Sequence, residues 1–399
     1  MMSNKKSLEH WLNLLETRHS KKIDLGLKRV KQVYDRLGIA KIAPTIITVA
    51  GTNGKGSTVA ILSAICQSAG YKVAEFTSPH LRHYNERIKI NSENATDAAI
   101  ISAFTQIEKA CGDVSLSYFE YATLAAAIIF KNNHVDVAIL EVGLGGRLDS
   151  VNVIDPDCAI ITTIDIDHTN WLGDTIEAIA YEKAGIMRPN KPVIYGDKNC
   201  PQSIVDYAKK INAQLEIARP LSPKQRPQHN LSGAYQYKNI ASSLAALAAL
   251  NHLHISEQAI TDGLQNIKLA GRLQTIKQHP HVIIDVSHNQ QAAKELAKWL
   301  QNNPISGTTY AVFAVLEDKH ASNWLAYFAD CIDVWCLSQV DSTRAMLTED
   351  LLAALVQSAW LICSFQTVAL AYEKAKIMAN SDDRIIVFGS FYTVSEVLA

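Results

Sequence analysis

The stretch VAGTNGKGST, residues 49–58, decides the fold class of this chain. It follows an apolar run at 46–49 and leads into further apolar residues at 59–65, a pattern that predicts a buried strand, a glycine-rich turn and a helix. Such a turn directs backbone N–H groups and the positive end of the helix dipole at a phosphate group, and Lys55 adds a positive charge. Glycines let the backbone approach the anion because they carry no side chain.

The turn departs from the common nucleotide-binding loop. The pattern G-x-x-x-x-G-K-[ST] would need glycine in place of Val49 and a hydroxyl residue directly after Lys55, whereas Gly56 stands there and Ser57 follows. The alternative interpretation is a glycine-rich turn without a ligand. We favour a phosphate-binding loop of a variant kind.

Composition and charge disfavour several classes of protein. The 399 residues include 38 Lys and Arg against 39 Asp and Glu, so the chain lacks the basic excess that nucleic-acid or membrane-surface binding needs. The seven cysteines are scattered without a C-x-x-C pair, which favours reduced thiols. Residues 1–6 lead into no signal-peptide core, and the longest apolar stretches, such as 122–130, are too short to span a bilayer. We expect a cytoplasmic protein with no nucleic-acid or membrane partner.

Short apolar runs alternate with helical patterns along the first part of the chain. An amphipathic helix opens it, with apolar residues at 8, 11, 12 and 15. The runs are continuously apolar rather than alternating, as expected for strands with helices on both faces, so we predict a doubly wound α/β domain. The strands are predicted at 45–49, 72–76, 135–142, 158–164 and 192–195.

A second α/β alternation occupies the final third of the chain. A polar, proline-punctuated stretch at 196–234, with a helix-like piece at 204–211 and a short strand at 215–217, precedes a predicted helix at 237–250. Strands are then predicted at 281–286, 309–315, 333–338 and 384–389. We place the boundary near Gly271, with an ATP-binding type of domain at 1–270 and a smaller Rossmann-like α/β domain at 271–399.

Polar side chains stand where predicted strands end. Glu141 ends one strand, and His168 follows the next strand along the chain. Ligands of open α/β sheets bind beyond the carboxyl ends of strands, so a carboxylate beside a phosphate loop could hold Mg²⁺. The alternatives are a strand-end salt bridge for Glu141, a structural role for His168, a helix cap for Ser78 and a solvated side chain for Lys183.

Together these motifs resemble the folylpolyglutamate synthase/dihydrofolate synthase family within the Mur-ligase superfamily. The resemblance covers nearly the whole chain, and its motifs occur in the family's order. They are GTNGKGS (51–57), TSPHL (77–81), SYFE (117–120), EVGLGGRLD (141–149), DH (167–168), EKAGI (182–186), GR (271–272), Asp285 with HN (288–289), and VFGSF (387–391).

The resemblance implies a nucleotide site between the two domains. The implied cofactors are ATP, Mg²⁺ at two sites and K⁺ as a further candidate, with Lys183 carried as a carbamate. The ATP-contacting residues would be Thr52, Asn53, Gly54, Lys55, Gly56, Ser57, Asn239, Arg272 and Asp285. The metal ligands would be Ser78, Glu141, His168 and Lys183, with Ser57 as a candidate helper. The catalytic residues would be Lys55, His168, Lys183, Arg272 and His288.

The resemblance also implies a pterin-binding region, formed by Thr17, Arg18, His19, Ser117, Tyr118, Phe119, Glu120, Leu148, Asp149 and Ser150. The alternative for Tyr118 and Phe119 is a place in the core of a helix that runs into 122–130. The chain departs from the family pattern at three positions: Ala270 replaces a common proline, His320 replaces the second aspartate of Asp-Lys-Asp, and Gln290 follows Asn289 in place of proline. The segment 196–234 is also shorter than is usual.

The implied activity is an ATP-dependent ligase that adds L-glutamate to dihydropteroate and to tetrahydrofolates through an acyl phosphate. Another Mur-type amide ligase, or a non-catalytic nucleotide-binding protein, is the alternative. The partners would be these small molecules, and we expect a monomer.

Overall fold

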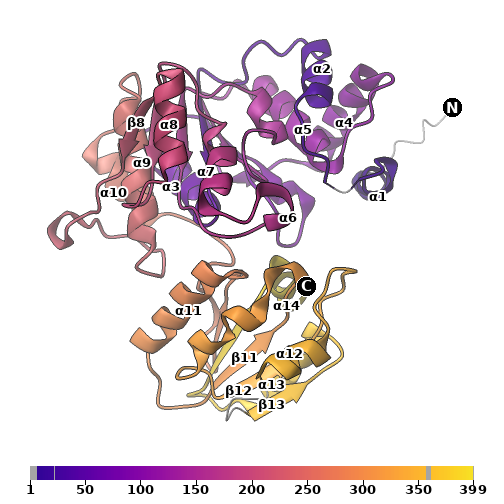
Figure 1. The fold of residues 1–399 in the computed structure, drawn as a ribbon, viewed down its shortest axis with the longest axis vertical. Helices are drawn as coiled ribbons and strands as arrows, with labels where there is room; N and C mark the ends of the chain where they lie inside the picture. Colours follow the sequence, from indigo (N-terminus) through magenta and orange to yellow (C-terminus); the bar gives the residue numbers. More distant parts are fainter. Residues whose placement is uncertain (1–6, 22, 356–360, 399) are drawn as a thin grey trace. The chain divides into compact units, whose positions relative to one another are not determined.

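The structure, a computed structural model, describes residues 7–21, 23–355 and 361–398. The signal-peptide prediction rests partly on Met1 to Lys6, which lie outside the described residues. The chain divides into two compact units (Figure 1). Unit 1 comprises residues 1–230 and 237–267, and unit 2 comprises 231–236 and 268–399.

Unit 1 is built on a mixed sheet with a parallel centre. Its strand order is β4-β3-β2-β5-β1-β6-β7-β8, in which β3 and β4 form an antiparallel edge and the other six strands are parallel. The strands are β1 (Thr45–Ala50), β2 (Val73–Phe76), β3 (Ile88–Ile90), β4 (Glu93–Asn94), β5 (Val137–Glu141), β6 (Cys158–Ile161), β7 (Pro192–Tyr195) and β8 (Gln214–Ile217).

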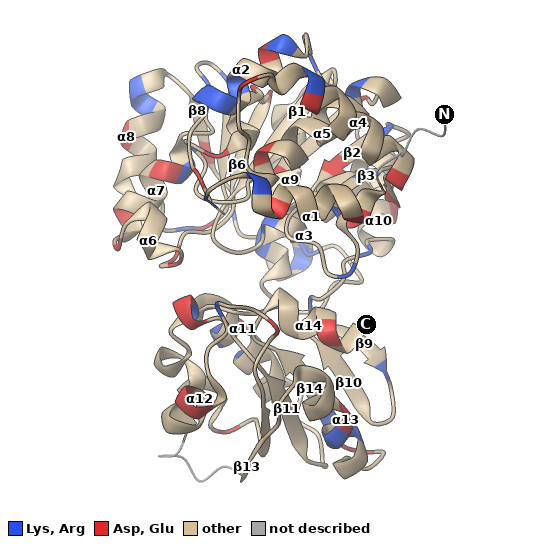
Figure 2. Cartoon of the chain, turned by 90° about the vertical axis from the view of Figure 1, so that its right-hand side faces the viewer, with Lys and Arg blue, Asp and Glu red and all other residues tan. Residues whose placement is uncertain are grey.

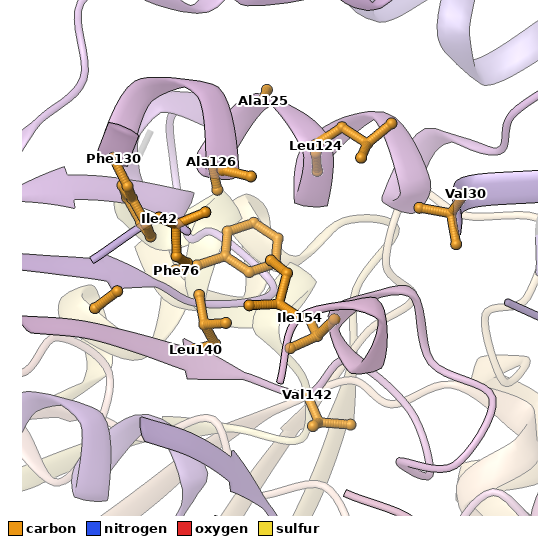
Figure 3. Packing of buried hydrophobic residues seen from close by; sticks show 14 of the residues in the cluster. Val30, Ile42, Phe76, Leu124, Ala125, Ala126, Phe130, Leu140, Val142 and Ile154 are labelled. Atoms are coloured by element: carbon orange, nitrogen blue, oxygen red, sulfur yellow. The ribbon is translucent and has the colours of Figure 1, made fainter. Parts of the chain in front are cut away.

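Helices cover both faces of the unit 1 sheet. On one face α4 (Asp97–Cys111) and α5 (Tyr118–Asn133) pack over the strands, and Figure 3 shows Phe76 of β2 and Leu140 of β5 beneath Ala126 and Phe130 of α5. On the other face α3 (Lys55–Ser68) contacts β1, β2 and β5, and α10 (Glu257–Gln265) packs on α3. The remaining helices are α1 (Leu8–Arg18), α2 (Lys28–Arg36), α6 (Thr169–Leu172), α7 (Ile176–Ala184), α8 (Gln202–Ile211) and α9 (Gln236–Ala249). All six residues of β1 are buried, which explains its continuously apolar sequence.

Unit 2 is a smaller α/β unit. Its strand order is β13-β12-β11-β14-β10-β9, parallel except for β9, which pairs antiparallel with β10. The strands are β9 (Gln274–Lys277), β10 (His281–Ile284), β11 (Thr309–Phe313), β12 (Val334–Leu337), β13 (Leu361–Ser364) and β14 (Arg384–Phe388). The helices are α11 (Gln290–Asn302), α12 (Thr348–Leu355), α13 (Val368–Met378) and α14 (Phe391–Leu398).

The predicted fold class is confirmed, and the strands expected from continuous apolar runs are present, most of them with slightly shorter bounds, β7 as predicted and β1 one residue longer. The sequence reading missed β3, β4, β9 and β13. These four strands lie at or next to sheet edges and have two to four residues each, so they lack the long apolar signature of a strand covered on both faces.

Basic and acidic residues are interspersed along the helices, strands and loops of both units (Figure 2). Within the described part of the chain, no helix is long and apolar enough to cross a membrane.

Candidate active site

The phosphate-loop candidate, residues 51–57, joins β1 to α3. Its backbone is held by the segment that follows β6: Thr52 N donates to Thr163 O at 2.7 Å, and Thr52 Oγ1 donates to Asp165 O at 3.1 Å. Asn53 N also approaches Thr163 Oγ1 at 3.3 Å. The loop is thereby fixed between the carboxyl ends of β1 and β6, which are neighbours in the sheet.

Two glycines of the loop leave no room for a side chain. Gly51 has φ +148°, and a Cβ atom there would overlap Thr162 Oγ1. Gly54 has φ +86°, and its Cβ would lie 2.5 Å from Asn239 Oδ1. Asn239 belongs to α9. The structure therefore brings a predicted ATP-contacting residue from a distant helix against the loop.

Lys55 is the first residue of α3, so its charge adds to the positive end of the helix dipole. Its Nζ donates to Gly51 O at 3.0 Å and to Thr52 O at 3.2 Å, which curls the side chain over the loop. Ser57 is buried in the first turn, with 2% of its surface exposed, and the first turn of α3 contains no acidic residue. This end of the helix can therefore bind an anion.

The predicted carboxylate at the end of β5 is buried beside this loop. Glu141 is 5% exposed and stands opposite Val49 in the β1–β5 ladder. Its Oε2 accepts a hydrogen bond from Ser78 N at 3.1 Å. Capping was the alternative for Ser78, but the 3-10 turn after it, Tyr84–Arg87, has His83 as its cap residue. The structure therefore brings the first predicted pair of metal ligands together.

His168 precedes α6 and has a left-handed backbone, with φ 55°. Its Nε2 lies 3.9 Å from Asp167 Oδ2, and about a third of the imidazole is exposed. A partly exposed imidazole beside a carboxylate is compatible with metal binding.

Lys183 is the main correction to the sequence reading, which on residues alone favoured a solvated side chain. It lies in the last turn of α7 and is 4% exposed. Burial, and secondarily the positive charge of Lys55, lower the pKa of Lys183 to about 7, while Asp167 and Asp149 act in the opposite direction. The amine is therefore neutral in a large fraction of molecules at physiological pH.

The glycine cluster after β5 positions α7. A Cβ at Gly146 would lie 2.9 Å from Glu182 O and 3.1 Å from Lys183 O, so only glycine allows this close approach. Arg147 N donates to Glu182 O at 2.7 Å, and the Arg147 guanidinium pairs with the Glu182 carboxylate at 2.8 Å. The loop thereby holds the last turn of α7, which carries Lys183.

Asp149 has a buried structural position within the predicted pterin region. Its carboxylate accepts from Leu144 N and Val151 N, both at 2.9 Å, and so shapes the glycine-rich loop. Burial raises the pKa of Asp149 to about 6. Ser150 bonds Thr123 at 2.6 Å between hydroxyl oxygens, which ties the same loop to α5.

The segment 117–120 forms the start of α5. Ser117 caps the helix and Glu120, 2% exposed, accepts from Ser117 N at 2.7 Å in a capping box. Tyr118 and Phe119 are only half-buried, and a Cβ at Gly143 would lie 2.6 Å from the Phe119 ring. The two rings are neither fully buried nor fully exposed. Both interpretations therefore stay open, a pterin-binding role and a place in the core of the helix.

The predicted residues at the end of α1 are ordered by contacts that the sequence did not indicate. Arg18 pairs with Glu108 and donates to Tyr121 Oη at 3.2 Å. His19 Nε2 lies 3.1 Å from Asp24 Oδ2, and Asp24 pairs in turn with Arg29 at 2.9 Å.

Further contacts bring the chain that follows α1 to the start of α5 and to the glycine-rich loop after β5. Arg29 Nη2 reaches Glu120 Oε1 at 3.3 Å, which connects the chain after α1 to the start of α5. Leu148 O accepts from Gly26 N at 3.0 Å. Thr17, in contrast, is exposed and donates to Asn13 O at 3.2 Å within its own helix. The sequence alone did not indicate that Asp24 and Arg29 support this region, because their role depends on these long-range partners.

Three predicted residues gather at one edge of the unit 2 sheet. Asp285 follows β10, is 2% exposed and accepts from Leu273 N at 2.8 Å; burial raises its pKa. The Arg272 guanidinium lies 5.2 Å from the centroid of the Phe391 ring, and the His288 ring is 6.2 Å from the same ring. They combine a cation, a carboxyl and an imidazole at one place.

The Asp-Lys-His departure lies elsewhere in unit 2. Asp318 pairs with Arg344 at 2.7 Å, and Lys319 Nζ lies 3.8 Å from Asp318 Oδ2. His320 has φ 47°, a left-handed conformation that Asp and His both tolerate better than most residues.

The candidate metal ligands in unit 1 are side chains of different chemical types. No group of three or more His, Cys, Asp or Glu side chains suited to a metal ion occurs among residues 7–21, 23–355 and 361–398. The candidate donors are instead a carboxylate with a serine, and an imidazole with a buried lysine.

Comparison with known proteins gives the same interpretation. The Mur ligase middle domain matches residues 49–238, and the Mur ligase glutamate ligase domain matches residues 271–391. The dihydrofolate synthase/folylpolyglutamate synthase of Escherichia coli (strain K12) is 42% identical over 404 residues, which cover 98% of this chain and 94% of that protein.

Solved structures agree over nearly the whole length. E. coli FolC in complex with DHPP and ADP superposes with a TM-score of 0.93 at 41% identity, covering 98% of this chain and 97% of that one. The bifunctional folylpolyglutamate synthase/dihydrofolate synthase of Yersinia pestis, complexed with AMPPNP and Mn, gives a TM-score of 0.90 at 40% identity and covers 98% and 97%.

Proposed function

This chain belongs to the dihydrofolate synthase/folylpolyglutamate synthase family of the Mur ligases, and from that premise we propose that it is an ATP-dependent, ADP-forming ligase. It adds L-glutamate to dihydropteroate and to reduced folates. The observation that carries the proposal is the buried Lys183 of α7, whose backbone approaches the glycine-rich loop that follows Glu141 and whose pKa is lowered in part by the charge of Lys55. A plain nucleotide-binding protein would have no need of this arrangement.

ATP binding is assigned to the phosphate loop and to residues of unit 2. Residues 52–57 would surround the phosphates with backbone N–H groups and the Lys55 ammonium, and Asn239 lies against Gly54. Arg272 and Asp285 are proposed as further nucleotide contacts. Residues 1–270 would thus act as the ATP-binding domain and 271–399 as the glutamate ligase domain.

Mg²⁺ fits the donors at the sheet edge. Glu141 and Ser78 would hold one ion, and Ser57 is a candidate helper there. His168 and Lys183 would hold a second ion. A divalent ion neutralises phosphate charge and polarises the transferred phosphoryl group when bound. The buried Glu141 carboxylate is an oxygen donor of the kind that Mg²⁺ prefers, and the partly exposed His168 offers an imidazole nitrogen. K⁺ is proposed as an additional cation.

Lys183 is proposed to work as a carbamate. The neutral amine adds to CO₂ and loses a proton, which converts a cation into an anionic oxygen donor. The lowered pKa of Lys183, about 7, supplies the neutral amine that this reaction requires.

The carbamate can be observed without turnover. Protein equilibrated with ¹³C-labelled bicarbonate should give a carbamate carbon signal by NMR that is missing from Lys183→Met. Absence of that signal in the wild-type protein would refute the modification while leaving the ligase proposal standing.

The reaction needs positioning and charge neutralisation rather than a protein nucleophile. The carboxylate of the pterin substrate attacks the γ-phosphorus of ATP, forming an acyl phosphate and releasing ADP. The amino group of L-glutamate then attacks the acyl carbon, loses a proton and displaces inorganic phosphate. Lys55 and Arg272 would stabilise the negative charge of the transferred group, and His288 is proposed to assist beside Arg272.

The pterin is proposed to bind where α1, the start of α5 and the glycine-rich loop meet. The half-buried rings of Tyr118 and Phe119 offer aromatic faces to a flat heterocycle. His19 and Arg18 lie in the same neighbourhood, because Arg18 contacts Tyr121 of α5. Their bonds to Asp24 and Glu108 would hold this wall of the site in place.

A side-by-side assay tests the proposal. Purified protein is given ATP, Mg²⁺ and L-glutamate with either dihydropteroate or a tetrahydrofolate, and ADP and product mass are measured. We expect glutamate addition to both. No product from either pterin would overturn the proposal and leave another Mur-type amide ligase as the explanation, and product from the tetrahydrofolate alone would remove the dihydrofolate synthase activity.

The cellular context is part of the proposal. We propose a cytoplasmic monomer whose partners are dihydropteroate, tetrahydrofolates and L-glutamate, with no nucleic-acid or membrane partner. Support comes from the balanced charge of 38 Lys and Arg against 39 Asp and Glu. Sedimentation of the purified protein would test the oligomeric state.

A further inference from the structure

Two cysteines stand opposite each other on neighbouring strands of the unit 2 sheet. Cys336 of β12 and Cys363 of β13 are register partners in a parallel ladder. Neighbouring strands lie about 4.8 Å apart, which falls within the Cα–Cα range of roughly 4.4–6.8 Å that a disulfide spans. Both cysteines are free thiols.

Their side chains share one face of the sheet. Trp335 and Leu337 belong to a core cluster on the opposite face, and Ile362 packs against the same cluster. Because side chains alternate along a strand, Cys336 and Cys363 both lie on the face that α13 covers. Burial raises the pKa of Cys336 to about 12, and Cys363 adds a smaller rise.

The two thiols differ in access to solvent. Cys336 is completely buried, whereas Cys363 is half-buried. Within the described sheet β13 is the edge strand beside β12, so it can shift slightly toward its neighbour without breaking a second ladder there. Cys336 is therefore enclosed in unit 2, whereas part of Cys363 is exposed to solvent.

We propose that Cys336 and Cys363 form a reversible disulfide with a low-molecular-weight disulfide, such as glutathione disulfide, as the oxidant. The Cys363 thiolate attacks one sulfur of glutathione disulfide and releases one glutathione thiolate, leaving a mixed disulfide. Cys336 then loses its proton, attacks Cys363 Sγ and displaces the second glutathione. Two protein thiols are oxidised, and one glutathione disulfide is reduced to two glutathiones. This site does not depend on the ligase activity.

The test uses the full-length reduced protein in glutathione buffers of increasing oxidised fraction. Remaining thiols are blocked with N-ethylmaleimide, and the intact mass and peptides are measured. We expect a species about 2 Da lighter than the reduced protein before alkylation, because two thiol hydrogens are lost, with a cross-linked peptide pair containing residues 336 and 363. Adding dithiothreitol should restore both thiols.

Three variants make the result specific. Cys363→Ser should abolish the cross-link, and Cys336→Ala, an apolar replacement for a buried thiol, should leave Cys363 as a lasting glutathione adduct. Cys331→Ser, which removes another half-buried cysteine of unit 2, should behave as the wild type. Full alkylation of Cys336 and Cys363 across the whole series, or a cross-link of either to a different cysteine, would overturn the proposal.

Discussion

Replacing Lys183 with methionine should abolish ligation and at the same time stabilise unit 1. The side chain is 4% exposed, and burial lowers its pKa from 10.5 to about 7. Holding this amine in the folded state costs about 4 kcal/mol at pH 7 relative to an unperturbed lysine, because each pKa unit corresponds to about 1.4 kcal/mol. Methionine has a similar length and no charge, so Lys183→Met removes that cost.

The expected pH dependence follows from the direction of the shift. Between pH 7 and 10.5 the unfolded chain binds more protons at this lysine than the folded chain does, so wild-type stability rises with pH. The cost falls from about 4 kcal/mol at pH 7 to about 2 kcal/mol at pH 9. The stability advantage of Lys183→Met should therefore shrink by about 2 kcal/mol over this range, and it should be fully present below pH 7.

Hydrogen exchange across a urea series, read from peptides of β5 and α7, measures the free energy of unfolding of unit 1 separately from that of unit 2. The buffer must be free of CO₂, because a carbamate would change the charge of the side chain. Lys319→Met is a matched control in unit 2 and is read from peptides of β11 and β12. Lys319 is also buried, but it lies 3.8 Å from Asp318 Oδ2, so its replacement should not stabilise unit 2. If the free energy of unfolding of Lys183→Met exceeded that of the wild type by the same amount at pH 7 and at pH 9, the reasoning would be refuted.

Further predictions concern the loop, the carboxylate and the pterin region. Glu141→Gln should lower kcat by about 10²-fold or more, because phosphate charge is left uncompensated, whereas Glu75→Gln, at a buried glutamate that bonds Ser63, should keep its turnover. Gly54→Ala should lose nucleotide affinity in a calorimetric titration, because its Cβ would lie 2.5 Å from Asn239, whereas Gly70→Ala has a similar φ of +88° with nothing within 4 Å and should bind normally. Phe119→Ala should lower kcat/KM for dihydropteroate more than for a tetrahydrofolate; equal losses with both substrates would assign the ring to the core instead.

Local signals were sufficient to predict the loop and its neighbours. The apolar run of β1, the glycines at 51 and 54 and the helix that begins at Lys55 are consecutive in the chain, so their structure depends little on distant residues. Glu141 was predicted to reach the same edge because parallel strands end together, and its register opposite Val49 agrees.

The burial of Lys183 could not be predicted from its own helix. It depends on the approach of Gly146, whose Cβ would lie 3.1 Å from Lys183 O, and on the bond from Arg147 N to Glu182 O. These contacts join segments far apart in the sequence, and helix periodicity carries no information about them. The bridge from Arg29 to Glu120 was missed for the same reason.

The most direct test of ligation through an acyl phosphate is a single-turnover reaction with dihydropteroate labelled with ¹⁸O in its carboxylate, together with ATP, Mg²⁺ and L-glutamate. We expect dihydrofolate, ADP and inorganic phosphate in equal amounts, with one ¹⁸O atom transferred from the pterin to the phosphate. Absence of dihydrofolate, or ¹⁸O in AMP with release of pyrophosphate, would contradict the proposed reaction.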